Sequence, residues 1–149
     1  MTKADIYKFI AEQKLGVLGT LSSGGSPQSA LVGIAVTPEL EIIFDTVNTS
    51  RKFHNLMLNP RCSFVVGWEG EITVQYEGQA SQPNGAELAR YQQAYFARWP
   101  ECRSHLSWSG ITYFVVQPYW IRYSDFDQNP PSIEEFTFET NRSATRLIP

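Results

Sequence analysis

The chain has 149 residues, of which 42% are hydrophobic and 13% aromatic, so it is long enough and apolar enough to fold as one globular domain. This composition excludes a disordered or coiled-coil protein for the bulk of the chain. Its 12 Lys and Arg against 15 Asp and Glu give a net charge of −3, which offers no general positive field to a nucleic-acid backbone or an anionic membrane.

The two cysteines and the N-terminal segment restrict the class of protein further. Cys62 and Cys102 form no CxxC pair, which excludes a disulfide framework and a zinc site of ordinary spacing. Asp5 and Lys8 interrupt the segment where a signal peptide needs an apolar core, and the apolar run 30–36 is too short to cross a bilayer. We therefore expect a soluble cytoplasmic protein.

The chain is predicted to begin with a helix, a strand and a turn. Thr2 is placed to cap a short helix that runs toward Gln13, because Ile6 and its apolar neighbours recur at helical spacing. A strand over 16–21 leads into the segment 22–27, where two glycines supply the positive φ angles of a hairpin turn.

Two further strands and a second helix are predicted next. The aliphatic runs 28–36 and 41–46 indicate strands that form a second hairpin. Between residues 50 and 59 the apolar side chains fall on one helical face, and Pro60 closes this predicted helix.

The second half of the chain is predicted to be mainly β. Strand character resumes over 62–66, and residues 72–81 show the cleanest alternation of apolar and polar side chains in the sequence. A helix is expected from its cap Asn84 to about Arg98, and Pro100 stops it.

The last strands are expected over 111–116 and 119–123. Pro118 separates them, because it lacks the amide proton that a central ladder position requires. The residues 136–138 then add a weak edge strand.

The predicted elements define a fold class. Six to seven strands and three short helices, joined by connections too short for parallel crossovers, indicate a mainly β (α+β) fold with an antiparallel barrel or sandwich. No long polar linker divides the chain, so we expect one domain over 1–126 and a C-terminal tail over 127–149.

The segment from Asp45 to Lys52 breaks a local rule. A strand ends, a polar turn follows, and a helix begins with Ser50 as its cap and with Arg51 and Lys52 in its first turn. A helix N-terminus already carries about half a positive charge, so two cations there are unfavourable unless an anion is bound. A phosphate would accept the backbone amides and both cationic side chains. The alternative is a pair of solvated basic residues on a surface helix.

This strand, turn and helix resemble a known family. The sequence FDTVNTSRKFHNLMLNPRCSFVV, preceded by LGTLSSGGSPQSALVGIAV and followed by ITVQYEGQAS, is similar to the pyridoxamine 5′-phosphate oxidase-like proteins, which are FMN-binding split β-barrels. The resemblance runs from Gly16 to Ser81 and more loosely to Tyr123. It implies an antiparallel split β-barrel and a homodimer that holds both flavins at the subunit interface.

The resemblance also implies which residues contact the cofactor. The phosphate clamp corresponds to Ser50, Arg51 and Lys52, and the strand before it supplies flavin contacts at Asp45 and Thr46. The backbone of the second strand would pass the isoalloxazine ring, and the strand over 72–81 would supply one polar side chain. These further positions are Leu31, Val32, Gly33 and Thr73.

The sequence departs from true pyridoxamine 5′-phosphate oxidases at three places. Ala30 and Ala35 stand where those enzymes have Arg and Lys. Tyr91 corresponds to a substrate-phosphate tyrosine, but the arginine expected four residues later is Tyr95. At 120–122, Trp-Ile-Arg replaces an Arg-x-His pair. Because charge-assisted hydrogen bonds contribute roughly 1.5 to 3 kcal/mol each, we predict that flavin binding is kept and that oxidation of the vitamin phosphate is lost.

The histidines and cysteines of the chain are interpreted as structural rather than catalytic residues. His54 is expected on the polar face of its helix, and Cys62 is expected to be a small buried hydrophobe. Cys102 and His105 are close in sequence, but sequence neighbours seldom point at each other, and no partner for His105 is evident. No catalytic residue is assigned, and no metal site is expected.

The function predicted on these grounds is that of a flavin-dependent oxidoreductase acting on a small molecule, in which the flavin carries out the redox step. The alternative is a carrier, sensor or stress-related protein that binds a flavin, the deazaflavin F420 or haem without turnover. A barrel that binds single-stranded nucleic acid is disfavoured by the net charge of −3 and by the single basic pair.

Overall fold

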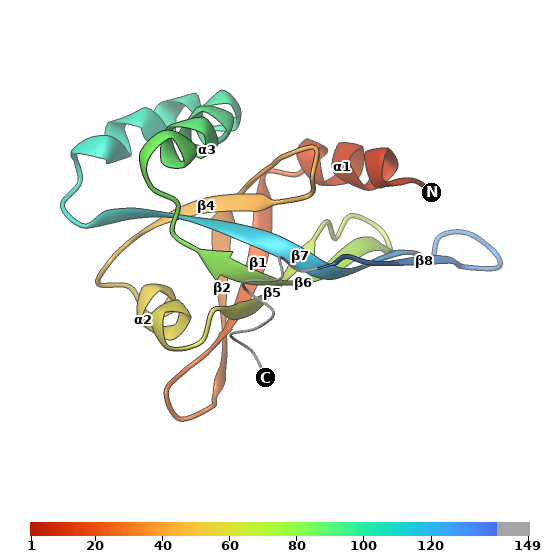
Figure 1. Cartoon of the computed structure of the whole chain (residues 1–149). Helices are drawn as coiled ribbons and strands as arrows, with labels where there is room; N and C mark the ends of the chain where they lie inside the picture. The colour runs from red at the N-terminus through yellow and green to blue at the C-terminus, as the bar shows by residue number, and fades with distance from the viewer. Residues whose placement is uncertain (140–149) are drawn as a thin grey trace.

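The fold is built on one antiparallel sheet of eight strands, in a computed structural model that describes residues 1–139. The strand order is β2-β1-β5-β6-β7-β4-β3, and β8 pairs with β7 (Figure 1). The mainly β, α+β prediction is confirmed. The strands are β1 (Leu15–Leu21), β2 (Pro27–Gly33), β3 (Ala35–Val36), β4 (Ile42–Val47), β5 (Arg61–Val66), β6 (Ile72–Ser81), β7 (Ile111–Asp125) and β8 (Ser132–Thr137).

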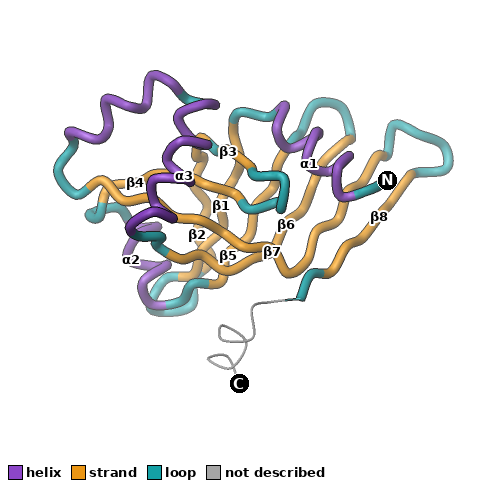
Figure 2. Tube along the Cα trace, turned by 45° about the horizontal axis from the view of Figure 1, so that its top comes forward, coloured by secondary structure: helices purple, strands orange, loops and turns teal. Residues whose placement is uncertain are grey.

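The helices pack against this sheet (Figure 2). Within the described residues they are α1 (Lys3–Glu12), α2 (Arg51–Leu58), α3 (Gly85–Arg98) and a 3₁₀ helix, η1 (Pro100–Ser107). The three α-helices were predicted, whereas η1 was not. None of these helices has the length and apolar character needed to span a bilayer.

The start of α1 forms as the sequence predicts. The Thr2 hydroxyl accepts the amide of Asp5 at 3.2 Å, and the Asp5 carboxylate accepts the amide of Thr2 at 2.7 Å. The carboxylate also accepts the Thr2 hydroxyl at 2.9 Å. The two bonds to the carboxylate, that from the Thr2 backbone first, lower the pKa of Asp5 because they favour its charged form. The helix buries Ile6 and Ile10 in the main core and so closes part of the barrel.

Two apolar clusters stabilise the fold, one on each side of β4. The main core fills the inside of the curved sheet and includes Phe44, Phe64 and Tyr76. A second cluster lies under α3 and η1, where Ile43 and Tyr95 meet. Because successive strand residues point to opposite faces, β4 contributes to both clusters.

The predicted strand 28–36 is interrupted, which corrects the expected hairpin. β2 pairs with β1, and only Ala35 and Val36 pair with β4. The chain leaves the ladder at Ile34, whose amide donates to the Lys14 carbonyl at 3.0 Å and whose carbonyl accepts the Trp99 indole N–H at 2.9 Å. These two contacts bind Ile34 outside the strands, and they allow the sheet to split between β2 and β4.

The strands predicted on either side of Pro118 form one continuous strand, β7. The missing amide of Pro118 is accommodated by a register shift opposite Glu77 and Gly78 rather than by a break. Gly78 is required there, because a Cβ at this position would lie 2.4 Å from the Gln117 carbonyl oxygen. The expected edge strand also forms, as β8, but it covers Ser132–Thr137 instead of 136–138.

Candidate functional site

The N-terminus of α2 carries the predicted phosphate clamp. Ser50 is the cap, and its Oγ accepts the amide of Phe53 at 3.2 Å and lies 2.8 Å from Thr46 Oγ1. Arg51 and Lys52 follow, and no acidic residue occupies the first turn. Because the first amides of a helix lack intrahelical partners, those of Arg51 and Lys52 remain for an anion.

Both cationic residues line a pocket of about 280 Å³. Its other wall consists of Thr20 at the end of β1 and three residues of β2, which are Gln28, Ser29 and Ala30. The structure therefore brings the start of α2 against the second strand, as a phosphate clamp beside that strand requires.

A buried amide network holds one side of this pocket. Asn55 Nδ2 donates to Thr20 Oγ1 at 2.9 Å and to Gln28 Oε1 at 2.8 Å, and Arg51 Nε donates to the same Gln28 oxygen at 3.2 Å. Gln28 thus fixes the guanidinium group over β2. The sequence analysis missed Gln28 and Asn55, although Asn55 lies one helical turn after Arg51 and therefore on the same face of α2.

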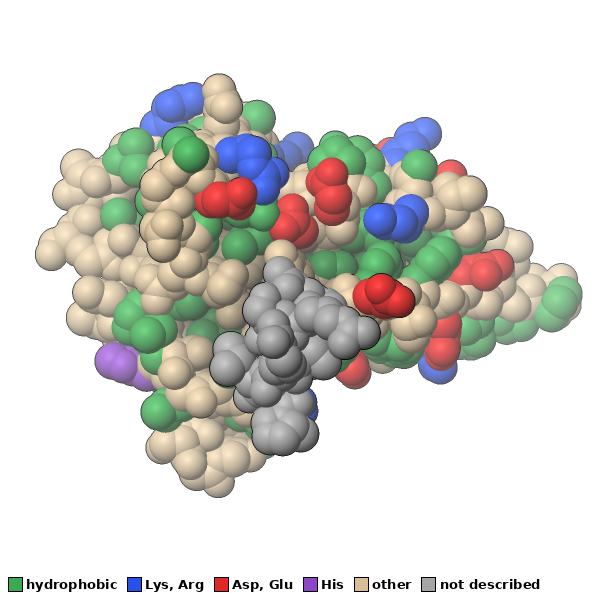
Figure 3. All heavy atoms as spheres, viewed as in Figure 1, with side chains coloured by type: hydrophobic (Ala, Val, Ile, Leu, Met, Phe, Trp, Pro, Cys, Tyr) green, Lys and Arg blue, Asp and Glu red, His purple; other side chains and the backbone are tan. Residues whose placement is uncertain are grey.

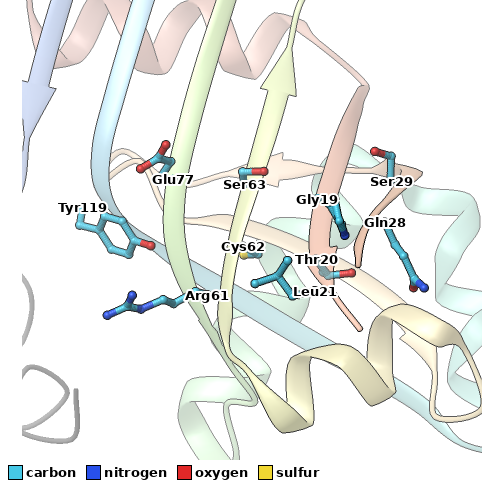
Figure 4. A pocket seen from close by; sticks show the side chains of 11 residues that line it. Gly19, Thr20, Leu21, Gln28, Ser29, Arg61, Cys62, Ser63, Glu77 and Tyr119 are labelled. Carbon is cyan, nitrogen blue, oxygen red and sulfur yellow. The ribbon is translucent and has the colours of Figure 1, made fainter. Parts of the chain in front are cut away.

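A second pocket, of about 340 Å³, continues from the first across the outer face of the sheet (Figure 4). The two pockets share Thr20, Gln28 and Ser29. Gly19 lies in the floor of this hollow, where a Cβ would meet Ser63 Oγ at 2.6 Å and require the serine hydroxyl group to rotate away. The remaining lining residues, from β1, β2, β5, β6 and β7, are Leu21, Pro27, Arg61, Cys62, Glu77 and Tyr119.

Cys62 lines the larger pocket, but its side chain is buried. Burial raises its pKa to about 12, so the thiol stays protonated at neutral pH. This agrees with its interpretation as a small buried hydrophobe, as does its place in the main core.

The residues predicted to pass the flavin ring lie at an edge of the sheet. β2 stands at one end of the strand order, so one side of its backbone is not paired with a further strand. The side chain of Leu31 is 61% exposed, whereas that of Val32 is buried in the core. The Gly33 carbonyl oxygen accepts the hydroxyl group of Tyr95 at 3.4 Å.

Thr73 lies apart from the clamp within one chain. Its Oγ1 donates to the carbonyl of Val66 at 3.4 Å, and it lines neither pocket. Glu77, which lines the larger pocket, is four residues further along β6, or about 13 Å at the usual rise of a strand.

Asp45 and Thr46 are neighbours on β4 but face opposite sides. Thr46 is buried and meets Ser50, so the structure places it with the clamp. The Asp45 side chain faces α3 and η1, where Oδ2 lies 2.8 Å from His105 Nδ1 and Oδ1 accepts the Tyr95 hydroxyl at 3.3 Å. The two residues therefore belong to different surroundings.

His105 thus has a partner that the sequence did not reveal. Asp45 lies 60 positions earlier, and only the packing of η1 on β4 brings the two side chains together. The imidazole also stacks on Trp108, with ring centroids 3.8 Å apart. His54, in contrast, is exposed on α2, as predicted.

Among the positions that differ from true oxidases, Arg122 alone carries a cation, and it is paired with a carboxylate. The Tyr91 hydroxyl is buried and donates to Glu41 Oε2 at 2.6 Å, and Tyr95 is occupied by Asp45. Arg122 pairs with Glu135 of β8, with Nε 2.8 Å from Oε1. Ala30 lines the clamp pocket, and Ala35 is buried under α3.

The surface charge is local rather than extended. On the face shown in Figure 3, basic and acidic side chains are interspersed, with no broad area of one sign. Among residues 1–139, no group of three or more His, Cys, Asp or Glu is placed to hold a metal ion. Anion binding in this part of the chain therefore depends on specific side chains such as Arg51 and Lys52.

Solved structures share the fold at low sequence identity. A haem-binding protein from Mycobacterium smegmatis superposes with a TM-score of 0.79 at 20% identity over 92% of this chain, which spans 58% of that protein's length. The haem storage protein HutZ from Vibrio cholerae gives 0.67 at 20% identity over 76% of this chain and 87% of its own. A pyridoxamine 5′-phosphate oxidase-related, FMN-binding protein from Nostoc punctiforme gives 0.64 at 11% identity over 93% of both chains.

Sequence comparison identifies the family. No curated protein is similar enough to match this chain. A family model described as pyridoxamine 5′-phosphate oxidase matches residues 2–125, which is most of the chain. The split sheet and the arrangement of β2, β4 and α2 agree with that match, and the protein belongs to the pyridoxamine 5′-phosphate oxidase family.

Proposed function

We propose that the protein binds FMN, with the phosphate in the pocket between α2 and β2. The observation that carries this proposal is the placement of Arg51 and Lys52 at a helix N-terminus whose pocket is closed by β2. The residues fit the group, because a phosphate would receive two cations, two backbone amides and the cap hydroxyl of Ser50. The bound anion would also relieve the unfavourable cation placement that the sequence shows.

The rest of the cofactor would follow β2 away from the clamp. Its unpaired backbone edge at Leu31, Val32 and Gly33 offers amide and carbonyl groups to the polar edge of the ring, and Thr46 lies beside the cap. Bound flavin would supply hydride or electron transfer to a small molecule, so the protein acts as an oxidoreductase. Asp45 and Thr73 remain predicted flavin contacts. Both lie away from the clamp within one chain, so they would contact only the flavin ring or a flavin held by a second subunit.

The experiment is the absorbance spectrum of the protein purified without added cofactor. We expect flavin bands from a mononucleotide that is released on denaturation. The Arg51→Ala/Lys52→Ala variant should lose flavin and keep its fold, because Arg51 is exposed and Lys52 is only partly buried. The matched control, Lys3→Ala/Lys8→Ala, removes the same charge from α1 and should retain flavin. Equal flavin retention in both double variants would exclude Arg51 and Lys52 as the residues that bind the phosphate.

The reaction is not the oxidation of pyridoxamine 5′-phosphate. The phosphate of this substrate would meet Ala30 in place of a cation. The Tyr91 hydroxyl is bonded to Glu41, and Arg122 is paired with Glu135. Without free cations the substrate phosphate would lose several charge-assisted hydrogen bonds. The flavin-loaded protein should therefore fail to oxidise this compound, and turnover at ordinary enzymatic rates would contradict the proposal.

The protein is proposed to form a homodimer through the outer face of β1, β2 and β5. The register places Leu31, Val17 and Val65 in one row across these strands, and Leu31 and Val65 are exposed there. A second copy would cover this row and the adjoining pocket, and would enclose the cofactor. Val65→Arg should convert the dimer to a monomer by light scattering and reduce flavin retention, whereas Ile133→Arg, on β8, should change neither.

Haem is a second candidate ligand. The observation that favours it is His105, whose Nδ1 contacts Asp45, because such a carboxylate partner orients a metal-bound imidazole. Two structurally similar proteins are described as haem-binding or haem-storing. A Soret band in the purified protein, lost in His105→Ala, would favour this candidate over FMN.

A further inference from the structure

The pocket beside the clamp has a second wall, which β1 and β2 supply. Thr20 and Gln28 lie opposite each other in the register of these strands (Figure 4), and both line the pocket of about 280 Å³ that Arg51 and Lys52 line from α2. Thr20 is 5% exposed, so its side chain has little freedom to turn toward bulk solvent. We call the side chains of Thr20 and Gln28 the strand wall.

The orientation of the amide groups at this wall follows from Arg51. Its Nε lies 3.2 Å from the Gln28 side chain, and a guanidinium group only donates hydrogen bonds, so Gln28 presents its oxygen, Oε1, to it. Asn55 contacts the same oxygen at 2.8 Å and must therefore present its nitrogen, Nδ2. That nitrogen also donates to Thr20 Oγ1 at 2.9 Å. One arginine thus sets the direction of three linked hydrogen bonds.

Two donors remain unused once these bonds are made. Gln28 Nε2 makes no hydrogen bond with residues 1–139, and it is not among the buried atoms that lack a partner, so solvent or a ligand reaches it. Thr20 Oγ1 accepts from Asn55, and its own O–H group has no acceptor in the same part of the chain. A buried hydroxyl group with an unused proton on the wall of a pocket implies a ligand that accepts hydrogen bonds.

The opposite wall carries positive charge without a counterion. Neither Arg51 nor Lys52 forms an ion pair with an acidic side chain of the described chain, and the first turn of α2 has no acidic residue. The pocket therefore presents two cations from one side and two neutral donors from the other. An anion whose oxygens carry no protons satisfies both walls, whereas an ammonium group satisfies neither.

We propose that Gln28 Nε2 and the Thr20 hydroxyl group bind the phosphate of the cofactor from the side opposite to the clamp, and that they select a flavin with a phosphate over one without. The inference rests on the proposed function, to which it adds two binding residues. The terminal oxygens of a phosphate monoester supply enough acceptors for both cations and for both donors of the strand wall. Asn55 acts as a positioning residue, because its amide holds Gln28 and Thr20 in these orientations.

The experiment compares FMN with riboflavin, which lacks the phosphate, by titration of the flavin-free protein. Gln28→Glu keeps an oxygen for Asn55 and Arg51 but replaces the free donor by a carboxylate oxygen. We expect it to weaken FMN binding about hundredfold and riboflavin binding by less than about threefold, because only the phosphate meets the change. Gln93→Glu is the matched control, because it adds the same charge on the exposed side of α3, away from this pocket, and should bind both flavins normally.

The Thr20 hydroxyl group is tested by a second pair of variants. Thr20→Val removes the hydroxyl group at nearly constant volume and should weaken FMN binding about tenfold, as expected for the loss of one charge-assisted hydrogen bond. Thr20→Ser keeps a hydroxyl group and should recover most of this affinity. Urea unfolding reports the stability of each variant separately. An equal loss of FMN and riboflavin binding would mean a purely structural role and would overturn the proposal.

Inorganic phosphate separates this inference from the proposed function. In nitrogen-15 NMR spectra it should shift the side-chain amide signal of Gln28 and leave that of Gln93 in place. Wild-type FMN affinity in the strand-wall variants, together with loss of FMN from Arg51→Ala/Lys52→Ala, would refute the strand wall and leave the clamp. A protein whose Gln28 signal responds to phosphate but which binds neither flavin would refute FMN as the ligand and support the strand wall as an anion site. The absence of both responses would overturn both.

Discussion

Two tyrosine–carboxylate pairs attach α3 to β4 and to the residue just before it, and they differ in length, burial and sharing. Tyr91 and Tyr95 are one helical turn apart, and their partners are Glu41, directly before β4, and Asp45, within it. The first bond is 2.6 Å long and buried, and Thr37 also donates to Glu41, at 3.0 Å. The second is 3.3 Å long, and its carboxylate is shared with the partly exposed His105.

The same contact type therefore serves two purposes. A short buried bond to a carboxylate holds the helix on the sheet, because leaving either group unpaired would cost its desolvation. A long, shared bond next to solvent leaves its carboxylate available to a histidine. Similar residues at equivalent positions along a helix and a strand thus do not imply similar roles.

The largest difference between the pairs should appear in stability. Tyr91→Phe removes a buried hydrogen bond to a carboxylate and should lower the free energy of unfolding by about 2 kcal/mol. Tyr95→Phe should lower it by less than about 1 kcal/mol, because Asp45 keeps its contact with His105. Urea unfolding of both variants measures the contrast, and equal losses would remove the distinction drawn above.

The next effect should appear at alkaline pH. Burial, followed by the hydrogen bond to Glu41, raises the pKa of Tyr91 from 10.0 to about 12. The folded state therefore binds this proton more tightly than the unfolded state, so its contribution is complete below pH 10 and is lost as the pH rises toward 12. Thermal unfolding across this range should show a smaller loss for Tyr91→Phe than for wild type, and identical profiles would count against the assignment.

The smallest effect is expected at Tyr113, which lies opposite Asp45 but belongs to neither pair. Its hydroxyl group is buried and makes no hydrogen bond to any of residues 1–139, so Tyr113→Phe removes none of the hydrogen bonds within this part of the chain. The free energy of unfolding should change by no more than about 0.5 kcal/mol, or rise slightly. A loss comparable to that of Tyr91→Phe would mean that this hydroxyl group has a bound water or ligand as its partner.

Local signals were sufficient for the parts of the fold that local interactions determine. The cap and side-chain spacing of α1, the cap at Ser50 and the alternation along β6 all specify structure within a few residues. The break at Ile34 could not be predicted, because it depends on hydrogen bonds to Lys14 and Trp99 from distant parts of the chain.

Only part of the pocket at α2 is local in sequence. Arg51 and Lys52 adjoin and share one helix start, whereas Gln28, which forms part of the opposite wall, lies 23 positions before Arg51 and was not predicted to be there. The Asp45–His105 contact was not predictable, because it joins β4 to a 3₁₀ helix that no sequence pattern indicated. Resemblance to a family did not indicate it either.

The open edge of β2 has a consequence for handling the protein. Unpaired strand edges are templates for aggregation, and this one carries the exposed side chain of Leu31. A second chain or a bound cofactor that covers this edge would also reduce precipitation. If FMN binds there as proposed, preparations with little FMN should precipitate on storage, and adding flavin to the growth medium should raise the yield of soluble protein.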